Sequence, residues 1–180
     1  MEELIKKIYG KYTMGAYKKM DLQEFRMPRY REIPNVCLFL EQTVKYINTT
    51  FEPLGCIEIT PSMVSNYVKK RYVKGPVKKQ YDAVSIAQLI FAAVAKSVIS
   101  MDNIRTMLEM QDAEYAIDVA YNRFCELFEA TLLSKEAGLG DNVEVAPAGD
   151  TDKDKLDTML NHVVIAAVQI IRLHNCFEQL

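Results

Sequence analysis

The sequence lacks a long apolar run. No stretch approaches the roughly 20 consecutive apolar residues that a helix needs to cross a bilayer, and the most apolar run, 163–171, already contains Gln169. The first residues, MEELIKKIYGKY, mix charged and single apolar side chains and lack the continuous apolar core and cleavage site of a signal peptide. We therefore expect a chain that does not associate with membranes and is located in the cytoplasm.

Motifs of catalysis and metal binding are missing as well. The sequence contains no glycine-rich phosphate loop, nucleophile elbow or H-E-x-x-H pattern, so we expect neither enzyme activity nor a cofactor. Its four cysteines form no C-x-x-C pair and its two histidines cannot complete a four-ligand zinc shell, so we expect no metal and buried free thiols. The cysteines are Cys37, Cys56, Cys125 and Cys176, and the histidines are His162 and His174.

Charge is present, but it is divided between two parts of the chain. With 49% hydrophobic residues over 180 positions, the chain can build a core. Residues 1–110 hold 17 Lys and Arg against 11 Asp and Glu, a balance of +6, whereas residues 111–180 hold 5 against 13, a balance of −8. The two balances recover the net charge of −2, and they indicate different roles for the two parts.

Apolar residues at helical spacing predict a mostly α fold. We expect an N-terminal arm over 1–33, a domain of helices and one hairpin over 34–110, and a two-helix region over 111–180 with an acidic linker around 135–153. The predicted elements are helices over 35–47, 60–70, 83–99, 100–110, 112–135 and 155–177, a loop over 48–59 and a hairpin over 72–81.

The helix over 60–70 carries two contrasting faces. Thr60 can accept a hydrogen bond from an early backbone N–H and Pro61 suits the first helical position, so the pair predicts a sharp start. One face is apolar, and the other carries groups that can hydrogen-bond to phosphates or to base edges of a duplex. The apolar face is Met63, Val64, Tyr67 and Val68, and the polar face is Ser62, Ser65, Asn66 and Lys69.

The stretch YVKGPVKKQY, which follows this helix, predicts a short basic hairpin. β-branched and aromatic residues on both sides of Gly75 and Pro76 predict two very short strands with the turn at this pair. Lys74, Lys78 and Lys79 lie on the hairpin, and lysines beside a reading helix can neutralise phosphates and release counterions. The alternative is a solvated, lysine-rich edge that discourages strand aggregation.

From Thr60 to Met110 the sequence resembles the DNA-binding half of MerR-type regulators. The resemblance is carried by TPSMVSNYVKKRYV for the recognition helix, by KKQYDAVSIAQLIFAAVAKSV for the wing and the next helix, and by ISMDNIRTMLE for the short helix after it. With the preceding RMPRYREIPNVCLFLEQTVKYI, the chain more specifically resembles an uncharacterised bacterial family of small MerR-like helix-turn-helix proteins, itself named only as a domain of unknown function.

This resemblance implies a mostly α, winged MerR-like helix-turn-helix over 34–110 that binds double-stranded DNA and regulates transcription. The recognition helix, 61–70, would enter the major groove and the wing, 72–81, would contact phosphates. The loop over 48–59 is longer than the usual turn of this motif, and two long helices replace a single dimerising helix, so effector and metal sensing are not implied. The residues implied to bind DNA are Ser62, Ser65, Asn66, Lys69, Lys70, Arg71, Lys74, Lys78 and Lys79.

The acidic C-terminal region favours a homodimer through its helices, because helix-turn-helix proteins commonly bind two half-sites related by a two-fold axis. The alternative is that both long helices close the core of one chain. A small-molecule effector is unsupported, because the residues that could line a pocket are typical of plain core. A second function also stays open, that of a non-catalytic helical protein-interaction module without DNA binding. The pocket residues considered are Met107, Phe124, Phe128, Met159 and His162.

Overall fold

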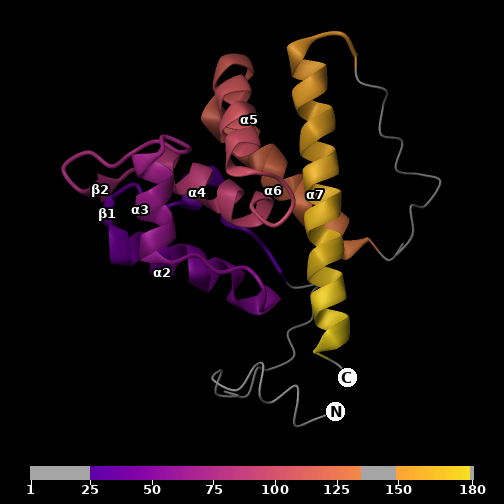
Figure 1. The fold of residues 1–180 in the computed structure, drawn as a ribbon, viewed down its shortest axis with the longest axis horizontal. Coiled ribbons are helices and arrows are strands. Elements are labelled where there is room, and N and C mark those ends of the chain that lie inside the picture. Colours follow the sequence, from indigo (N-terminus) through magenta and orange to yellow (C-terminus); the bar gives the residue numbers. More distant parts are fainter. Residues whose placement is uncertain (1–24, 135–148, 179–180) are drawn as a thin grey trace.

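The computed structural model describes residues 25–134 and 149–178, and its fold is mostly helical, as expected (Figure 1). Within these ranges six α-helices, two short 3-10 helices and a two-stranded antiparallel sheet are formed. In chain order they are η2 (Tyr30–Glu32), β1 (Leu38–Phe39), α2 (Leu40–Phe51), η3 (Glu52–Leu54), α3 (Pro61–Lys69), β2 (Gln80–Tyr81), α4 (Ala83–Ala95), α5 (Met101–Glu114), α6 (Ile117–Leu133) and α7 (Asp152–Phe177).

Helix α4 lies at the centre of the fold, as its apolar sequence predicts. Asp82 caps its first turn by accepting from the Ser85 N–H (2.8 Å), and every residue from Ser85 to Ala95 is buried. Helices α2, α5, α6 and α7 all pack against it. α4 ends at Ala95 rather than at the predicted residue 99, and a turn then leads to Ser100, whose hydroxyl caps α5 as predicted.

Helices α6 and α7 lie side by side and run parallel (Figure 1). Near the first turns of both helices Arg123 pairs with Asp157. Near their last turns Arg172 of α7 donates to the backbone carbonyls of Thr131 (2.9 Å) and Ser134 (2.5 Å). Contacts near both ends therefore hold the two helices of the acidic region against each other.

Helix α7 starts earlier than predicted. Thr151 caps it by accepting from the Asp154 N–H (3.1 Å), so the helix begins at Asp152 instead of residue 155. Of the acidic linker predicted around 135–153, residues 135–148 lie outside the described ranges.

By length and composition α7 could cross a membrane, a test that core helices of soluble proteins also pass, and 33% of its apolar window is buried. The cytoplasmic location therefore stays a prediction.

Residues 25–33, expected to belong to an N-terminal arm over 1–33, are part of the core. Residues 1–24 lie outside the described ranges, but Phe25, Met27 and Ile33 are buried. Glu129 of α6 holds the segment: its carboxylate accepts from the Met27 N–H (2.7 Å) and from both ends of the Arg29 guanidinium (2.7 and 2.5 Å). A bidentate pair of this kind orders the backbone on either side of it.

The predicted start of the helix over 35–47 is wrong. α2 begins only at Leu40, and Val36, an apolar residue within the predicted range, is 66% exposed. The reason is strand pairing, because Leu38–Phe39 forms an antiparallel ladder with Gln80–Tyr81. Extended backbone before α2 satisfies its hydrogen bonds with a partner some forty residues away.

The long helix predicted from residue 112 is interrupted at Tyr115, whose backbone is extended. α5 therefore continues to Glu114 and α6 starts at Ile117. The Tyr115 hydroxyl donates to the Asp157 carboxylate of α7 (2.8 Å), a contact that holds the break in place. Val119, an apolar residue in the first turn of α6, is 52% exposed.

Candidate nucleic-acid interface

The loop between α2 and α3 is long, but it is held at several points. Asn48 of α2 grips its end through two hydrogen bonds of 2.9 Å, one to the Ile59 carbonyl and one from the Ile59 N–H. Lys96 donates to the Glu58 carbonyl, and Leu54 and Ile59 are buried. The loop therefore fixes how α3 sits on α2 despite its length.

Helix α3 has the two predicted faces. The Thr60 hydroxyl accepts from the Met63 N–H (3.2 Å), which confirms the predicted cap, and Pro61 occupies the first turn. Val64 and Tyr67 are buried, and Met63 and Val68 pack half-buried against the core. The opposite face is exposed and consists of Ser62, Ser65, Asn66 and Lys69.

The end of α3 is strained at Arg71. The Tyr72 N–H donates to the Tyr67 carbonyl (2.9 Å) and the Arg71 N–H to the Val68 carbonyl (3.0 Å), the two bonds of a Schellman motif. This motif needs a left-handed residue, usually glycine, and Arg71 adopts φ 57° there. The chain consequently reverses with a basic, exposed side chain at the reversal.

The wing, residues 72–81, turns at Lys78 and Lys79 and not at the predicted Gly75 and Pro76. Val77 and Gln80 exchange two backbone hydrogen bonds of 2.9 Å, and the two lysines between them have φ of 51° and 66°. Two left-handed residues in a two-residue loop make a type I′ turn, whose twist suits a hairpin. Gly75 instead lies against Val68 of α3, where a Cβ would meet Val68 Cγ1 at 3.3 Å.

The base of the wing is anchored through Lys74. Its backbone N–H donates to the buried Gln88 (2.7 Å), and its ammonium donates to the Asp82 carboxylate (2.6 Å). Burial alone would raise the pKa of Asp82, but the hydrogen bonds from Lys74 and Ser85 outweigh it and lower that pKa. Lys74, although exposed, is thus engaged within the chain, unlike the lysines at the turn.

Arg105 of α5 joins this surface, and sequence reasoning missed it. The Tyr72 ring carries Lys70 Nζ and Arg105 Cζ, each 5.9 Å from the ring centroid, which is within the range of a cation–π contact. A cation in the middle of an amphipathic helix carries no local signal of such a role. Only the folded chain brings the guanidinium of α5 to Tyr72, three residues after the end of α3.

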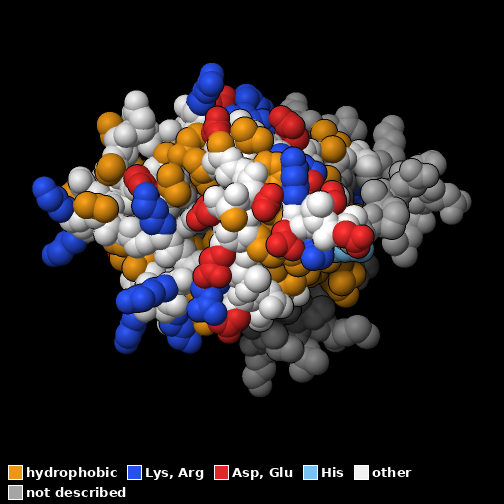
Figure 2. Space-filling view, turned by 90° about the horizontal axis from the view of Figure 1, so that it is seen from above, with side chains coloured by type: hydrophobic (Ala, Val, Ile, Leu, Met, Phe, Trp, Pro, Cys, Tyr) orange, Lys and Arg blue, Asp and Glu red, His pale blue; other side chains and the backbone are white. Residues whose placement is uncertain are grey.

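All nine residues predicted to bind DNA are exposed, and they lie on α3, on the two residues that follow it and on the wing, at one end of the molecule (Figure 1). Figure 2 shows Lys and Arg side chains at that edge, on the left of the view, whereas Asp and Glu gather over the middle and right. The charge imbalance of the sequence is therefore also an imbalance in space. A surface of this kind attracts polyanions.

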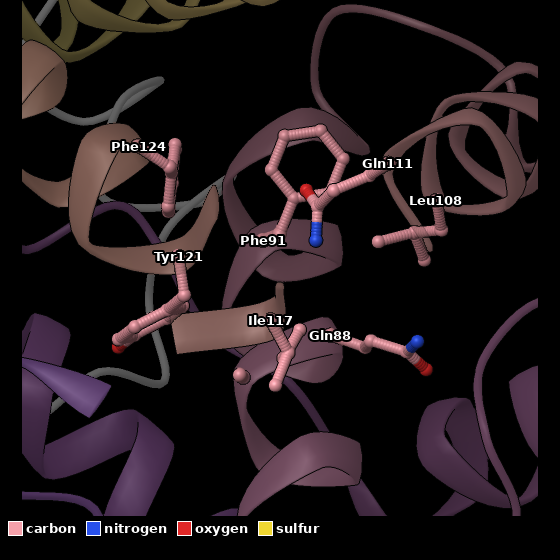
Figure 3. Close-up of a pocket in the computed structure, with 8 residues that line it drawn as sticks. Gln88, Phe91, Leu108, Gln111, Ile117, Tyr121 and Phe124 are labelled. Carbon is pink, nitrogen blue, oxygen red and sulfur yellow. The ribbon is translucent and has the colours of Figure 1, made fainter. Parts of the chain in front are cut away.

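No effector pocket is formed by the residues considered for one. Met107, Phe124 and Phe128 are buried, Met159 is half-buried and His162 is exposed. Side chains of α4, α5 and α6 close around a small cavity (Figure 3) whose interior leaves about 10 Å³ for the centre of a water molecule, enough for about one water. It is lined by Ala87, Gln88, Phe91, Leu108, Gln111, Ile117, Tyr121 and Phe124.

Of the four free cysteines, Cys125 alone fits the expectation of buried thiols. Cys37 and Cys176 are exposed and Cys56 is half-buried. Burial raises the pKa of Cys125 to about 12, so this thiol stays protonated at neutral pH. Within the described residues no group of three or more His, Cys, Asp or Glu side chains could hold a metal ion.

Fold and surface together define a mostly α protein with an exposed basic hairpin beside a two-faced helix. Residues 28–124, more than half of the chain, match a family described as a domain of unknown function (DUF1836), and the chain belongs to that family. The matched range holds β1, α3 and the wing and ends within α6. No curated protein and no solved structure matches the chain.

Proposed function

We propose that the chain is a sequence-specific DNA-binding transcriptional regulator, with α3 in the major groove and the wing on phosphates. Backbone strain is the observation that carries this proposal. Within the described ranges the non-glycine residues with positive φ are Arg71, Lys78 and Lys79, all basic and exposed. Each costs about 1–2 kcal/mol that glycine would avoid, and strain retained at exposed cations is typical of a binding site.

The order of the elements supports the same proposal. A short strand, α2, a loop, α3 and the wing follow one another, and α4 and α5 come next. This is the order of the winged, MerR-like helix-turn-helix that the sequence resembles, in which the second helix reads the groove. The exposed hydroxyls and amide of α3 suit that reading role.

The alternative, a protein-interaction module, is supported by two apolar side chains beside the wing turn. Phe39 and Val77 both pair with Gln80, so they share one face of the small sheet. They are 53% and 68% exposed. Apolar side chains exposed next to cations also fit an acidic protein partner.

The test is a fluorescence anisotropy titration of the full chain against mixed-sequence duplex at several salt concentrations. With about five phosphate contacts, log K should fall against log[salt] with a slope of about −4.5. Replacing Lys78 and Lys79 together by Gln should make that slope shallower by about 2. The matched control replaces Lys153 and Lys155, on the first turn of α7, together by Gln, and it should leave the salt slope unchanged.

Asn66→Ala should change the preference among duplex sequences more than the salt dependence, because an amide that reads bases carries no charge to release counterions. Absence of binding to any duplex at low salt would refute the DNA-binding proposal and favour the interaction module.

A further inference from the structure

The last three turns of α7 expose a row of large apolar side chains. Among the described residues eight large apolar side chains are exposed, and three of them lie in this one segment. Ile170, Leu173 and Phe177 are 41%, 57% and 64% exposed, and the half-buried Ala166 continues the row one turn earlier. We call Ala166, Ile170, Leu173 and Phe177 the α7 stripe.

The α7 stripe is separate from the face through which α7 packs on its own chain. Val164, Val168 and Ile171 are buried on that face. At 100° per residue the centre of the stripe lies nearly half a turn away from the centre of these three residues. The intervals of four, three and four residues along the stripe are those of a coiled-coil seam, in which one helix packs against another helix. The described residues cover one apolar face of α7 and leave the second uncovered.

The charges beside the α7 stripe indicate what kind of partner packs on this second face. The polar residues that flank the α7 stripe are Gln169, His174 and Cys176, all formally neutral. Arg172, the one Lys or Arg between residues 166 and 177, donates to the carbonyls at the end of α6. A two-fold interface sets each residue beside its own copy or near it, so a self-pairing surface must avoid like charges, and the α7 stripe avoids them.

The apolar pair at the wing does not satisfy this condition. Phe39 and Val77 lie beside Lys78 and Lys79, and pairing that face with itself would bring four ammonium groups together. We therefore infer that a second copy of this chain docks on the α7 stripe, α7 against α7. α3 and the wing lie away from α7 (Figure 1), so this pairing leaves both reading surfaces uncovered.

Sedimentation velocity of the full chain tests the inference, with Leu173→Glu as the disrupting variant. A carboxylate in the seam would be desolvated and would face its own copy, so this variant should sediment as the 20.6 kDa monomer while the wild type sediments as a dimer. Val119→Glu is the matched control, because Val119 is 52% exposed on α6 outside the stripe, and it should stay dimeric. Far-UV circular dichroism checks folding, and Ile170→Lys replaces the variant if Leu173→Glu does not fold.

Two outcomes would overturn the inference. One is a wild type that stays monomeric at high micromolar concentration, and the other is a Leu173→Glu chain that stays dimeric. A monomeric wild type that floats with mixed neutral and anionic phospholipid vesicles, when Leu173→Glu does not, would assign the stripe to a lipid surface instead. The assay contains no DNA, so a dimer that binds no duplex would refute the proposed function and leave this inference intact.

Discussion

The two ends of the molecule use their cationic side chains in opposite ways. Around α6 and α7, Arg29, Arg123 and Arg172 all donate to carboxylates or carbonyls of the same chain. Around α3 and the wing, Lys78 and Lys79 are exposed, and within the described residues neither forms an ion pair. Cations with a neighbouring acceptor in the same chain therefore stabilise the fold, and cations without one are available to a partner. Each of the following predictions tests or refines this difference.

The largest effect is expected from Glu129→Gln. It removes the charge that pairs with Arg29 and weakens the bond from the Met27 N–H, so the unfolding free energy should fall by about 2–4 kcal/mol. Urea denaturation measures this, and duplex binding should not change. Glu126→Gln, an exposed position on the same helix, is the control and should change stability by less than about 0.5 kcal/mol.

The same pair should make stability depend on pH. Burial alone would raise the pKa of Glu129, but hydrogen bonds from Arg29 and the Met27 N–H lower it below its ordinary 4.5. A carboxyl whose folded pKa is lowered contributes fully above the unfolded value and loses its contribution as pH falls through the folded one. The stability difference between wild type and Glu129→Gln should therefore shrink below about pH 4.5. A difference that stays constant down to pH 3 would contradict this explanation.

A gain in stability is expected at the wing turn. Lys79→Gly removes the left-handed strain and should raise the unfolding free energy by about 1 kcal/mol, while weakening duplex binding through the lost charge. Lys79→Ala loses the same charge but keeps the strain, so it should weaken binding equally without the gain. Thermal unfolding and anisotropy separate the two effects. Equal stability of the two variants would mean that the turn holds no strain.

Arg105→Gln should make the salt slope of duplex binding shallower by less than about 0.9, the contribution of one full phosphate contact, because its guanidinium also pairs with Asp102 (3.5 Å) and Glu109 (3.8 Å) of α5. Its guanidinium rests on Tyr72 beside Lys70, at the edge of the exposed basic surface. Arg26→Gln removes a cation that pairs with Glu32 outside α3 and the wing, and should leave the slope unchanged. Equal slopes for wild type and Arg105→Gln would remove Arg105 from the interface.

The smallest effect is expected from Lys74→Gln. Because the ion pair with Asp82 is solvent-exposed on both sides, its loss should cost only about 0.5 kcal/mol. The salt slope should stay close to that of the wild type, since this ammonium is held by Asp82, whereas Lys78→Gln should shift the slope by about 0.9 without affecting stability. If Lys74→Gln made the salt slope shallower by about one unit, Lys74 would instead be one of the phosphate contacts.

Features that depend on neighbours along the chain were predictable. Thr60 and Pro61 define the start of α3 because a cap acts within three residues, and the two faces of α3 follow from a period of 3.6 residues. Features that depend on distant partners were not. Glu129 draws Met27 into the core from about a hundred positions away, and β2 takes the residues before α2 into a strand. Arg105 reaches the candidate site in the same way, through the packing of α5.

The sequence by itself determined the mostly helical class, the basic and acidic halves, and the contrast between the faces of α3, because composition, period and capping act locally. Tertiary structure alone decided that the wing turns at two lysines, that Lys74 is an anchor, and that the described residues leave one apolar face of α7 uncovered. The anchor at Lys74 and the uncovered face of α7 depend on where other parts of the folded chain lie. At the wing, Gly75 lies against Val68 of α3, and Val77 and Gln80 close the turn by hydrogen bonds.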